Sequence, residues 1–223
     1  MIKLVIFDVD GTLLDTETVY IQSALETAKR YNYPITIEDL FKTIGGNSLR
    51  ARKIMSEVLG SEEIYDEYHE RMVNIWDETK RRDGVAFKEG AIELITYLKE
   101  NGIKIAIATS TKESRQMPNL KRTGLLPHLD YMVFGNQIKA SKPAPDIYLN
   151  VIDHFNIPKE EIIIFEDSPN GLLSGIASGV KTVFIPDYVK VSDEIIKDTY
   201  AQLNNLKEGI QLIKDINETT SSI

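Results

Sequence analysis

Two aspartates near the start of the chain, Asp8 and Asp10, are the residues whose type and spacing point most directly to chemistry. They follow the apolar run 2–7, which predicts a buried β-strand, and they lead into Gly11 and Thr12. Side chains alternate along a strand, so residues two apart project to the same side at its exit. We therefore expect two carboxylates in one small volume, where a bound cation, a shared proton or both would relieve their repulsion.

Other polar residues follow further apolar runs, at the points where buried strands would end. In an open parallel sheet, ligands bind in the crevice outside the carboxyl ends of the strands, so these residues belong together. Lys142 is reached by a loop beyond the run 131–134, and Pro143 and Pro145 stiffen the chain around it. The residues collected in this way are Asp8, Asp10, Thr12, Thr109, Ser110, Lys142, Glu166, Asp167 and Ser168. We expect them to form one polar site at one edge of the sheet.

The collected set contains four carboxylates, several hydroxyl groups and one ammonium group, with no histidine or cysteine at the strand ends. Hard oxygen ligands of this kind favour Mg²⁺ over zinc. A carboxylate has an ordinary pKa of about 4, so an aspartate is an ionised nucleophile at neutral pH without a base to activate it. Mg²⁺ and Lys142 would offset its repulsion from an anionic phosphate. The set therefore indicates phosphoryl transfer from a small phosphorylated molecule.

The elements that must position these residues alternate between strands and helices. Four apolar runs beyond the first predict buried strands, at 103–108, 131–134, 162–165 and 182–185. A helical pattern at 91–98 ends at the stop signal Asn101-Gly102, directly before the next strand. Pro118 predicts a kink or a split in the helix after Ser110. The alternation predicts an α/β fold, a Rossmann-like doubly wound parallel sheet with helices on both faces.

Residues 16–83 break this alternation, because they contain no strand-like run. Four amphipathic stretches follow one another there, at 16–30, 36–43, 48–59 and 62–80. We interpret the block as an all-helical cap inserted into an α/β core that consists of 1–15 and 84–223. Substrate specificity is then expected to come from the cap.

The composition of the chain is that of a globular protein. Its 223 residues allow a substantial core, and no apolar run approaches the length of a membrane span. The formal net charge of −8 argues against nucleic acid as a partner, because such binding depends on Lys and Arg at the phosphates. The chain has no cysteine, which excludes disulfides and thiolate chemistry. We expect a cytoplasmic monomer with a small-molecule substrate, no nucleic acid and no membrane contact.

The polar motifs resemble those of the haloacid dehalogenase superfamily of phosphohydrolases. The resemblance covers essentially the whole chain and is carried by Asp8-x-Asp10-Gly11-Thr12, Thr109, Lys142 and Glu166-Asp167. The helical insertion and the segment 140–146 are similar to the subgroup that contains β-phosphoglucomutase and small sugar-phosphate phosphatases. Asp10 resembles the aspartate that separates the phosphotransferases of this family from its dehalogenases. The resemblance implies a Mg²⁺-dependent hydrolase with a helical cap.

The resemblance also implies a role for each motif residue. Asp8 would be the nucleophile that forms an aspartyl-phosphate, and Asp10 would be the general acid and then the general base. Mg²⁺ would be held by Asp8, Asp167 and the backbone carbonyl of Asp10. Glu166 would act on the metal either directly or through a water. The transferring phosphoryl group would be bound by Thr109, the backbone of Ser110 and Lys142.

Phosphatases and mutases of this subgroup share the core chemistry, so the cap has to distinguish them. In the mutase a histidine of the first cap helix, together with basic residues around a glycine of a cap loop, handles the sugar. This chain aligns Tyr20 with the histidine, and Ile44 and Ser48 with the basic positions beside Gly45-Gly46. These differences favour a phosphatase acting on a sugar or polyol phosphate, with a phosphosugar mutase as the alternative. A non-catalytic phospholigand-binding module and hydrolysis of a non-phosphate substrate are less favoured, because the motifs are complete and include Asp10.

Overall fold

The computed structural model describes residues 1–43 and 48–221 of the chain. The cap-loop positions Ile44, Gly45 and Gly46, on which the comparison with mutases partly depends, lie outside the described residues. Within the described ranges, no helix has both the length and the apolarity needed to cross a membrane.

The chain forms two compact units. An α/β core consists of Met1–Leu14 and Ala86–Ile223, and a helical insert consists of Asp15–Val85. The junctions between the units therefore lie just after the first motif and shortly before the helix that begins at Ala91.

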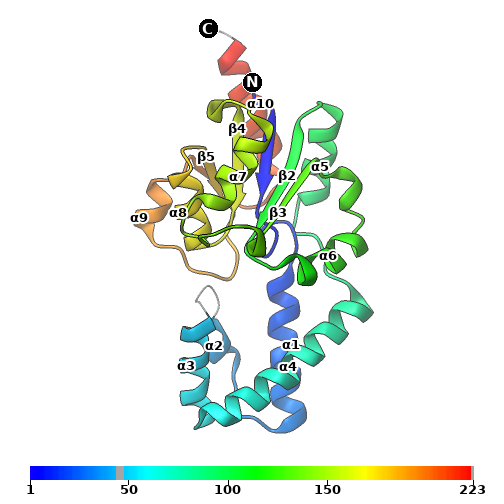
Figure 1. Ribbon diagram of the computed structural model, residues 1–223, viewed down its shortest axis with the longest axis vertical. Helices are drawn as coiled ribbons and strands as arrows, with labels where there is room; N and C mark the ends of the chain where they lie inside the picture. Colours follow the sequence, from blue (N-terminus) through cyan, green and yellow to red (C-terminus); the bar gives the residue numbers. More distant parts are fainter. Residues whose placement is uncertain (44–47, 222–223) are drawn as a thin grey trace. The chain divides into compact units, whose positions relative to one another are not determined.

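The core is built on a parallel sheet of six strands in the order β3-β2-β1-β4-β5-β6 (Figure 1). The strands are β1 Leu4–Phe7, β2 Lys104–Thr109, β3 Tyr131–Phe134, β4 Ile162–Glu166, β5 Lys181–Phe184 and β6 Ala201–Gln202. The fold class expected from the sequence is confirmed, and the first five strands lie where the apolar runs indicated them. β6 has no counterpart among the predicted strands, because two residues are too few to carry a periodic pattern.

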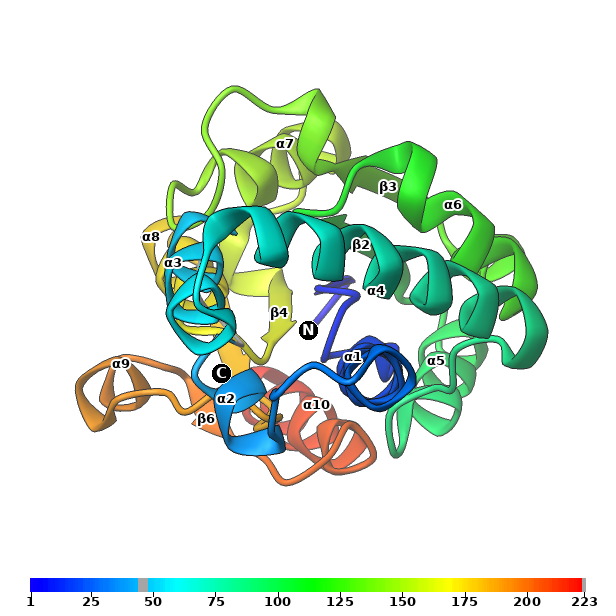
Figure 2. The same ribbon diagram turned by 90° about the horizontal axis from the view of Figure 1, so that it is seen from below.

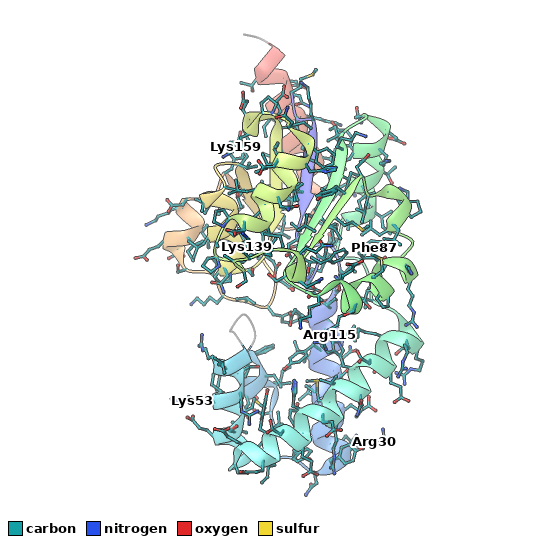
Figure 3. All side chains as sticks on the ribbon, in the orientation of Figure 1. Arg30, Lys53, Phe87, Arg115, Lys139 and Lys159 are labelled. Carbon is teal, nitrogen blue, oxygen red and sulfur yellow. The ribbon has the colours of Figure 1, made fainter. Side chains whose placement is uncertain are left out.

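Helices cover both faces of this sheet (Figure 2). The helices of the core are α5 Ala91–Glu100, α6 Glu113–Arg122, α7 Asp146–Phe155, α8 Pro169–Ala177, α9 Asp193–Lys197 and α10 Glu208–Ser221, with short 3₁₀ turns at Leu126–His128, Gly135–Gln137 and Lys159–Glu161. α7 packs on β2 and β3, and α8 packs on β4 and β5. On the other face α5 packs on β2, and α10 packs against α5. Because β1 is covered on both sides, all four of its residues are buried, which explains its uninterrupted apolar sequence.

Local signals in the sequence explain where two of these helices begin and end. α5 buries the apolar residues of its predicted pattern and ends at Glu100, with Asn101 of the predicted stop signal as its C-cap. α8 begins at Pro169 after Ser168, whose hydroxyl accepts a hydrogen bond from the Gly171 N–H at 3.1 Å. Serine at the N-cap followed by proline is a favoured helix start. Only Asp167 and Ser168 separate β4 from α8, so both lie at the carboxyl edge of the sheet.

α6 runs without interruption from Glu113 to Arg122 although it contains Pro118. Of the two alternatives expected at Pro118, the split is therefore wrong, and the kink stays a prediction. A proline removes the hydrogen bond to the carbonyl four residues earlier, which here belongs to Ser114. Ser114 and Pro118 are both exposed, so water can replace the lost bond and the helix continues.

The helical insert has a hydrophobic core of its own. Its helices are α1 Thr16–Tyr31, α2 Ile37–Phe41, α3 Ser48–Leu59 and α4 Glu62–Asp83. α4 packs against both α1 and α3, and the side chains buried in the insert include Ile21, Leu40, Met55 and Met72. The Tyr68 hydroxyl is also buried there and donates to the Ala24 carbonyl at 3.4 Å. The all-helical block expected from the amphipathic stretches is confirmed.

Candidate active site

The predicted polar residues gather at the carboxyl ends of β1, β2 and β4. β1 and β4 pair along their length with Phe7 opposite Phe165, so the residues that follow them leave the sheet side by side. Asp8 stays attached to the sheet, because its backbone N–H donates to the Phe165 carbonyl at 3.0 Å. In the strand order, β1 lies between β2 on one side and β4 on the other, and β5 follows beyond β4. A ligand crevice opens at such a switch point of a doubly wound sheet.

Lys142 connects these strand ends. Its ammonium nitrogen donates to Asp8 Oδ1 at 2.5 Å, to Glu166 Oε1 at 2.6 Å and to the Ala108 carbonyl at 3.2 Å. These acceptors use all the protons of the ammonium group, and the side chain is only 6% exposed. Burial would lower the pKa of Lys142, but the charges of Asp8 and Glu166 outweigh burial and raise that pKa well above its ordinary value. Lys142 therefore keeps a positive charge beside Asp8.

Glu166 is buried and accepts hydrogen bonds on both carboxylate oxygens. Its Oε1 accepts from Lys142 at 2.6 Å and from the Tyr148 hydroxyl at 3.1 Å. Its Oε2 accepts from the backbone N–H groups of Asp167 and Ser168, both at 2.8 Å, and from the Ser168 hydroxyl at 3.1 Å. Both oxygens of Glu166 are therefore occupied by donors, and its role at a metal, direct or through a water, stays a prediction.

Asp8 and Asp167 are both buried, and Asp167 receives a hydrogen bond from the Thr12 hydroxyl to Oδ1 at 2.7 Å. Burial raises the pKa of Asp8 to about 7, although the charge of Lys142 acts in the opposite direction. Burial also raises the pKa of Asp167 well above its ordinary value, and the charges of Glu166 and Asp8 add to this effect. A bound cation would stabilise both carboxylates in their ionised form.

Gly11 turns the chain beside these carboxylates and leaves room for them. Its φ is +87°, a value that residues with a Cβ rarely adopt. A Cβ on Gly11 would stand 2.4 Å from Asp167 Oδ2 and 3.0 Å from Asp187 Oδ2.

Asp187 is absent from the predicted set, and Lys88 Nζ donates to its Oδ1 at 2.7 Å. Asp187 follows the run 182–185 as the other site residues follow their strands, so its place after a strand is a signal in the sequence.

Asp10 is held by hydroxyl and amide groups. Its Oδ2 accepts from the Thr111 hydroxyl at 2.8 Å and from the Thr109 hydroxyl at 3.2 Å. Its Oδ1 accepts from Gln116 Nε2 at 3.4 Å, and Asn119 Nδ2 donates to the Gln116 Oε1 at 3.2 Å. Thr111 and Gln116 are also missing from the predicted set. Gln116 is buried on α6, and a lone polar residue in a helix carries no sequence signal that separates it from a solvated one.

Two glycines allow neighbouring segments to approach the site closely. A Cβ on Gly171 would stand 1.6 Å from Glu166 Oε1, so α8 lies against this carboxylate only because the residue is glycine. A Cβ on Gly135 would stand 2.1 Å from the carbonyl oxygen of Ser110. Ser110 itself follows β2 and is exposed. The expected part of its backbone in phosphate binding stays a prediction.

The family model of the haloacid dehalogenase-like hydrolases matches residues 5–185 of the chain. The chain belongs to the haloacid dehalogenase-like hydrolase family. It is similar to the phosphorylated carbohydrates phosphatase of Thermotoga maritima, with 36% identity over 82% of this chain and 84% of the relative. It is also similar to the protein CbbY of Rhodobacter capsulatus, with 32% identity over 86% of this chain and 89% of the relative.

Solved structures agree with this assignment. A crystal structure from Thermotoga maritima, provisionally described as a β-phosphoglucomutase, matches with a TM-score of 0.78 and 28% identity, over 96% of this chain and 99% of that one. The protein is thus a haloacid dehalogenase-like hydrolase of the phosphatase type.

A magnesium ion, which haloacid dehalogenase-like hydrolases typically use, fits the residues of this site. Mg²⁺ usually takes one or two carboxylates and keeps water or phosphate oxygens as its other ligands. Asp8 and Asp167 supply two buried carboxylates of raised pKa. Among the described residues, no three Asp, Glu, His or Cys side chains form a ready metal cluster, and a site with two carboxylates needs none.

Replacing Gly11 by alanine tests the turn between the carboxylates. The methyl group would overlap Asp167 Oδ2, and the backbone would be strained at φ +87°. We expect the rate of p-nitrophenyl phosphate hydrolysis to fall by about 100-fold or more, because small displacements at a reacting centre cost that much. Gly102→Ala is the matched control: its φ is +67°, and no described atom lies within 4 Å of the added Cβ. Gly102→Ala should lower the free energy of unfolding by about 1–2 kcal/mol and retain activity. Equal activity of the two variants would contradict the assignment of Gly11.

Proposed function

We propose that this protein is a Mg²⁺-dependent phosphatase that hydrolyses a small phosphorylated metabolite, a sugar or polyol phosphate, through an aspartyl-phosphate on Asp8. The observation that carries the proposal is the buried contact of 2.5 Å between Lys142 Nζ and Asp8 Oδ1. A fixed cation beside a carboxylate allows an anionic nucleophile to approach an anionic phosphate. The name of the Thermotoga maritima phosphatase, which refers to phosphorylated carbohydrates, supports the substrate class.

Asp8 acts as the nucleophile in this proposal. Attack requires the ionised carboxylate, and the charge of Lys142 favours that form against the effect of burial. The bond that forms joins an Asp8 oxygen to phosphorus, and the bond that breaks joins phosphorus to the substrate oxygen. Water then attacks the phosphorus of the aspartyl-phosphate, which releases inorganic phosphate and restores the carboxylate.

Lys142, Thr109 and the backbone of Ser110 bind the transferring phosphoryl group. Lys142 carries a permanent charge at the nucleophile, so it is placed to stabilise the oxygens of the phosphoryl group as charge develops on them. The Thr109 hydroxyl is buried at the end of β2 and lies 3.2 Å from Asp10 Oδ2. A phosphate oxygen that accepted the hydrogen bond of Thr109 would therefore take it from Asp10.

Asp8, Asp167 and the backbone carbonyl of Asp10 would hold Mg²⁺, whose charge offsets that of the phosphate oxygens. Glu166 supports this group, because it accepts from Lys142 and from the backbone N–H of Asp167. We propose that Glu166 acts on the metal through these neighbours.

Asp10 acts as general acid and then as general base. As an acid it gives a proton to the leaving oxygen of the substrate, and as a base it takes a proton from the attacking water. Thr111 and Gln116 hold its two oxygens at 2.8 Å and 3.4 Å, which orients the carboxyl group while Thr109 serves the phosphate. Proton transfer requires such an orientation, since it occurs only over hydrogen-bond distance.

The residue at the position of the mutase histidine supports hydrolysis. Tyr20 of α1 packs edge-on against Trp76 of α4, with ring centroids 5.7 Å apart. Burial raises the pKa of Tyr20 to about 12. Unlike a histidine, it does not gain or lose a proton near neutral pH. This position therefore lacks the group that distinguishes the mutase.

Asp8→Asn tests the nucleophile. The amide has nearly the shape of the carboxylate but is not nucleophilic, so we expect the rate of phosphate release to fall by about 1,000-fold or more. Asp153→Asn, an exposed substitution on α7, is the matched control and should retain the wild-type rate. Circular dichroism establishes that both variants fold. Unchanged turnover in Asp8→Asn would refute the assignment of Asp8 as the nucleophile. If the wild-type protein binds phosphate esters but does not hydrolyse them, it is a binding module and not an enzyme.

A panel of phosphate monoesters with Mg²⁺ tests the reaction and its substrate class. We expect phosphate release from sugar or polyol phosphates and loss of that release on removal of Mg²⁺ by EDTA. The competing reaction is the interconversion of glucose 1-phosphate and glucose 6-phosphate with a bisphosphate primer. Interconversion faster than phosphate release would identify a mutase and overturn the proposal.

Thr111→Val tests the orientation of Asp10. Valine keeps the volume but removes the hydroxyl that donates to Asp10 at 2.8 Å. We expect kcat to fall by about 10-fold, with KM within a factor of three, because the substrate itself is not contacted. Thr96→Val on the exposed side of α5 makes the same substitution away from the site and should leave kcat unchanged. A rise in KM alone would show that Thr111 binds substrate and does not position Asp10.

A further inference from the structure

Asp187 is a buried carboxylate at the carboxyl edge of the sheet to which the proposed reaction assigns no role. It follows β5, and its side chain is only 4% exposed. Lys88 Nζ donates to Oδ1 at 2.7 Å. Oδ2 is buried and has no hydrogen-bond partner among the described residues. A buried carboxylate oxygen without a hydrogen-bond donor is costly. Such an oxygen in a native structure usually contacts a bound water molecule or ion.

The unpartnered oxygen faces the proposed metal site. Asp187 Oδ2 lies 3.0 Å from the position that a Cβ on Gly11 would occupy, and Asp167 Oδ2 lies 2.4 Å from the same position. Two carboxylate oxygens thus converge on the space beside Gly11, from the ends of β4 and β5. The charge of Asp187 reaches Asp167, because it adds to the effect of burial and of Glu166 and Asp8 in raising the Asp167 pKa.

Lys88 occupies one oxygen of Asp187, and Oδ2 is the oxygen that has no hydrogen-bond partner among the described residues. The ammonium group of Lys88 already compensates the charge of Asp187 and occupies Oδ1. Mg²⁺ usually keeps several water molecules, whose protons need acceptors, and carboxylates beyond the direct ligands commonly accept them. Asp187 presents one fixed oxygen of this kind beside Asp167.

We propose that Asp187 positions the bound cation: Oδ2 accepts a hydrogen bond from a water molecule on the Mg²⁺ held by Asp8 and Asp167, while Lys88 fixes the carboxylate. This inference rests on the Mg²⁺ site of the proposed function and adds a positioning residue to it. The competing explanation is that Asp187 and Lys88 only clamp two loops of the core together.

Asp187→Asn separates the two explanations by a measurement that needs no turnover. Asparagine keeps the shape of the side chain but weakens the acceptor that faces Asp167. In the full-length protein, we expect the Kd for Mg²⁺ from isothermal titration calorimetry to rise by about 10–100-fold. Asp198→Asn is the matched control, because it removes an exposed carboxylate beyond α9 and should leave the Kd within a factor of two.

Thermal unfolding and a conservative variant complete the experiment. Saturating Mg²⁺ should raise the Tm of the wild type above its value in EDTA. The same addition should raise the Tm of Asp187→Asn by less, since a ligand that binds the native state more weakly stabilises that state less. Asp187→Glu keeps a carboxylate on a longer side chain and should bind Mg²⁺ more tightly than Asp187→Asn.

The outcomes distinguish the inference from the function on which it rests. A lower Tm of Asp187→Asn in EDTA with an unchanged Kd for Mg²⁺ would leave a structural clamp and overturn the inference. Equal losses of affinity in Asp187→Asn and Asp187→Glu would overturn it as well. If Asp8→Asn loses Mg²⁺ binding while Asp187→Asn does not, the proposed function stands and the role of Asp187 falls. A wild-type protein that does not bind Mg²⁺ would refute both.

Discussion

The buried ammonium group of Lys142 is the interaction on which the rest of the site depends. It comes from the segment between β3 and α7, yet its hydrogen bonds reach Asp8 beyond β1, the Ala108 carbonyl of β2 and Glu166 of β4. Breaking a buried ion pair by removing one partner costs about 3–5 kcal/mol, because the remaining charge is left without compensation. The three strand ends and the lysine are therefore held in one arrangement. Because Glu166 also accepts from the Asp167 N–H, the same network places the second carboxylate of the proposed metal site.

The charge balance of the site explains why it would bind both a cation and a phosphate. Lys142 faces Asp8 and Glu166 at once, so a single positive charge serves two carboxylates. Asp167 adds a third carboxyl group, whose Oδ1 accepts a hydrogen bond from the Thr12 hydroxyl. Burial raises the pKa values of Asp8 and Asp167, because water is not available to stabilise their ionised forms, and the neighbouring carboxylates add to this effect. A divalent cation would reverse this balance and leave the edge of the sheet able to accept the oxygens of a phosphate.

Much of this arrangement could be predicted from the sequence, and the omissions have physical causes. The strands are recognisable because a sheet covered on both faces requires continuous apolar runs. The motif residues are recognisable because they come directly after these runs, where ligands bind in a parallel sheet. Asp187 follows β5 in the same way, so its position at a strand end is visible in the sequence as well. Thr111, Gln116 and Gly171 are different, because they matter through contacts with Asp10 and Glu166 that no spacing along the chain reveals. The split that was one of two alternatives at Pro118 does not occur, because Ser114 and Pro118 lie on the exposed side of α6.

The linear sequence specifies the fold class, the division into an α/β core and a helical insert, and the chemical types gathered at the strand ends. These features depend on periodicity and composition, which are local properties of the chain. Only the folded core decides that Lys142 bridges Asp8 and Glu166 and that the Thr111 hydroxyl donates to Asp10. It also decides that Asp187 turns toward Gly11 an oxygen that has no partner among the described residues. Several of these contacts join residues that are more than a hundred positions apart in the chain. They form because parallel strands bring distant segments to one edge of the sheet.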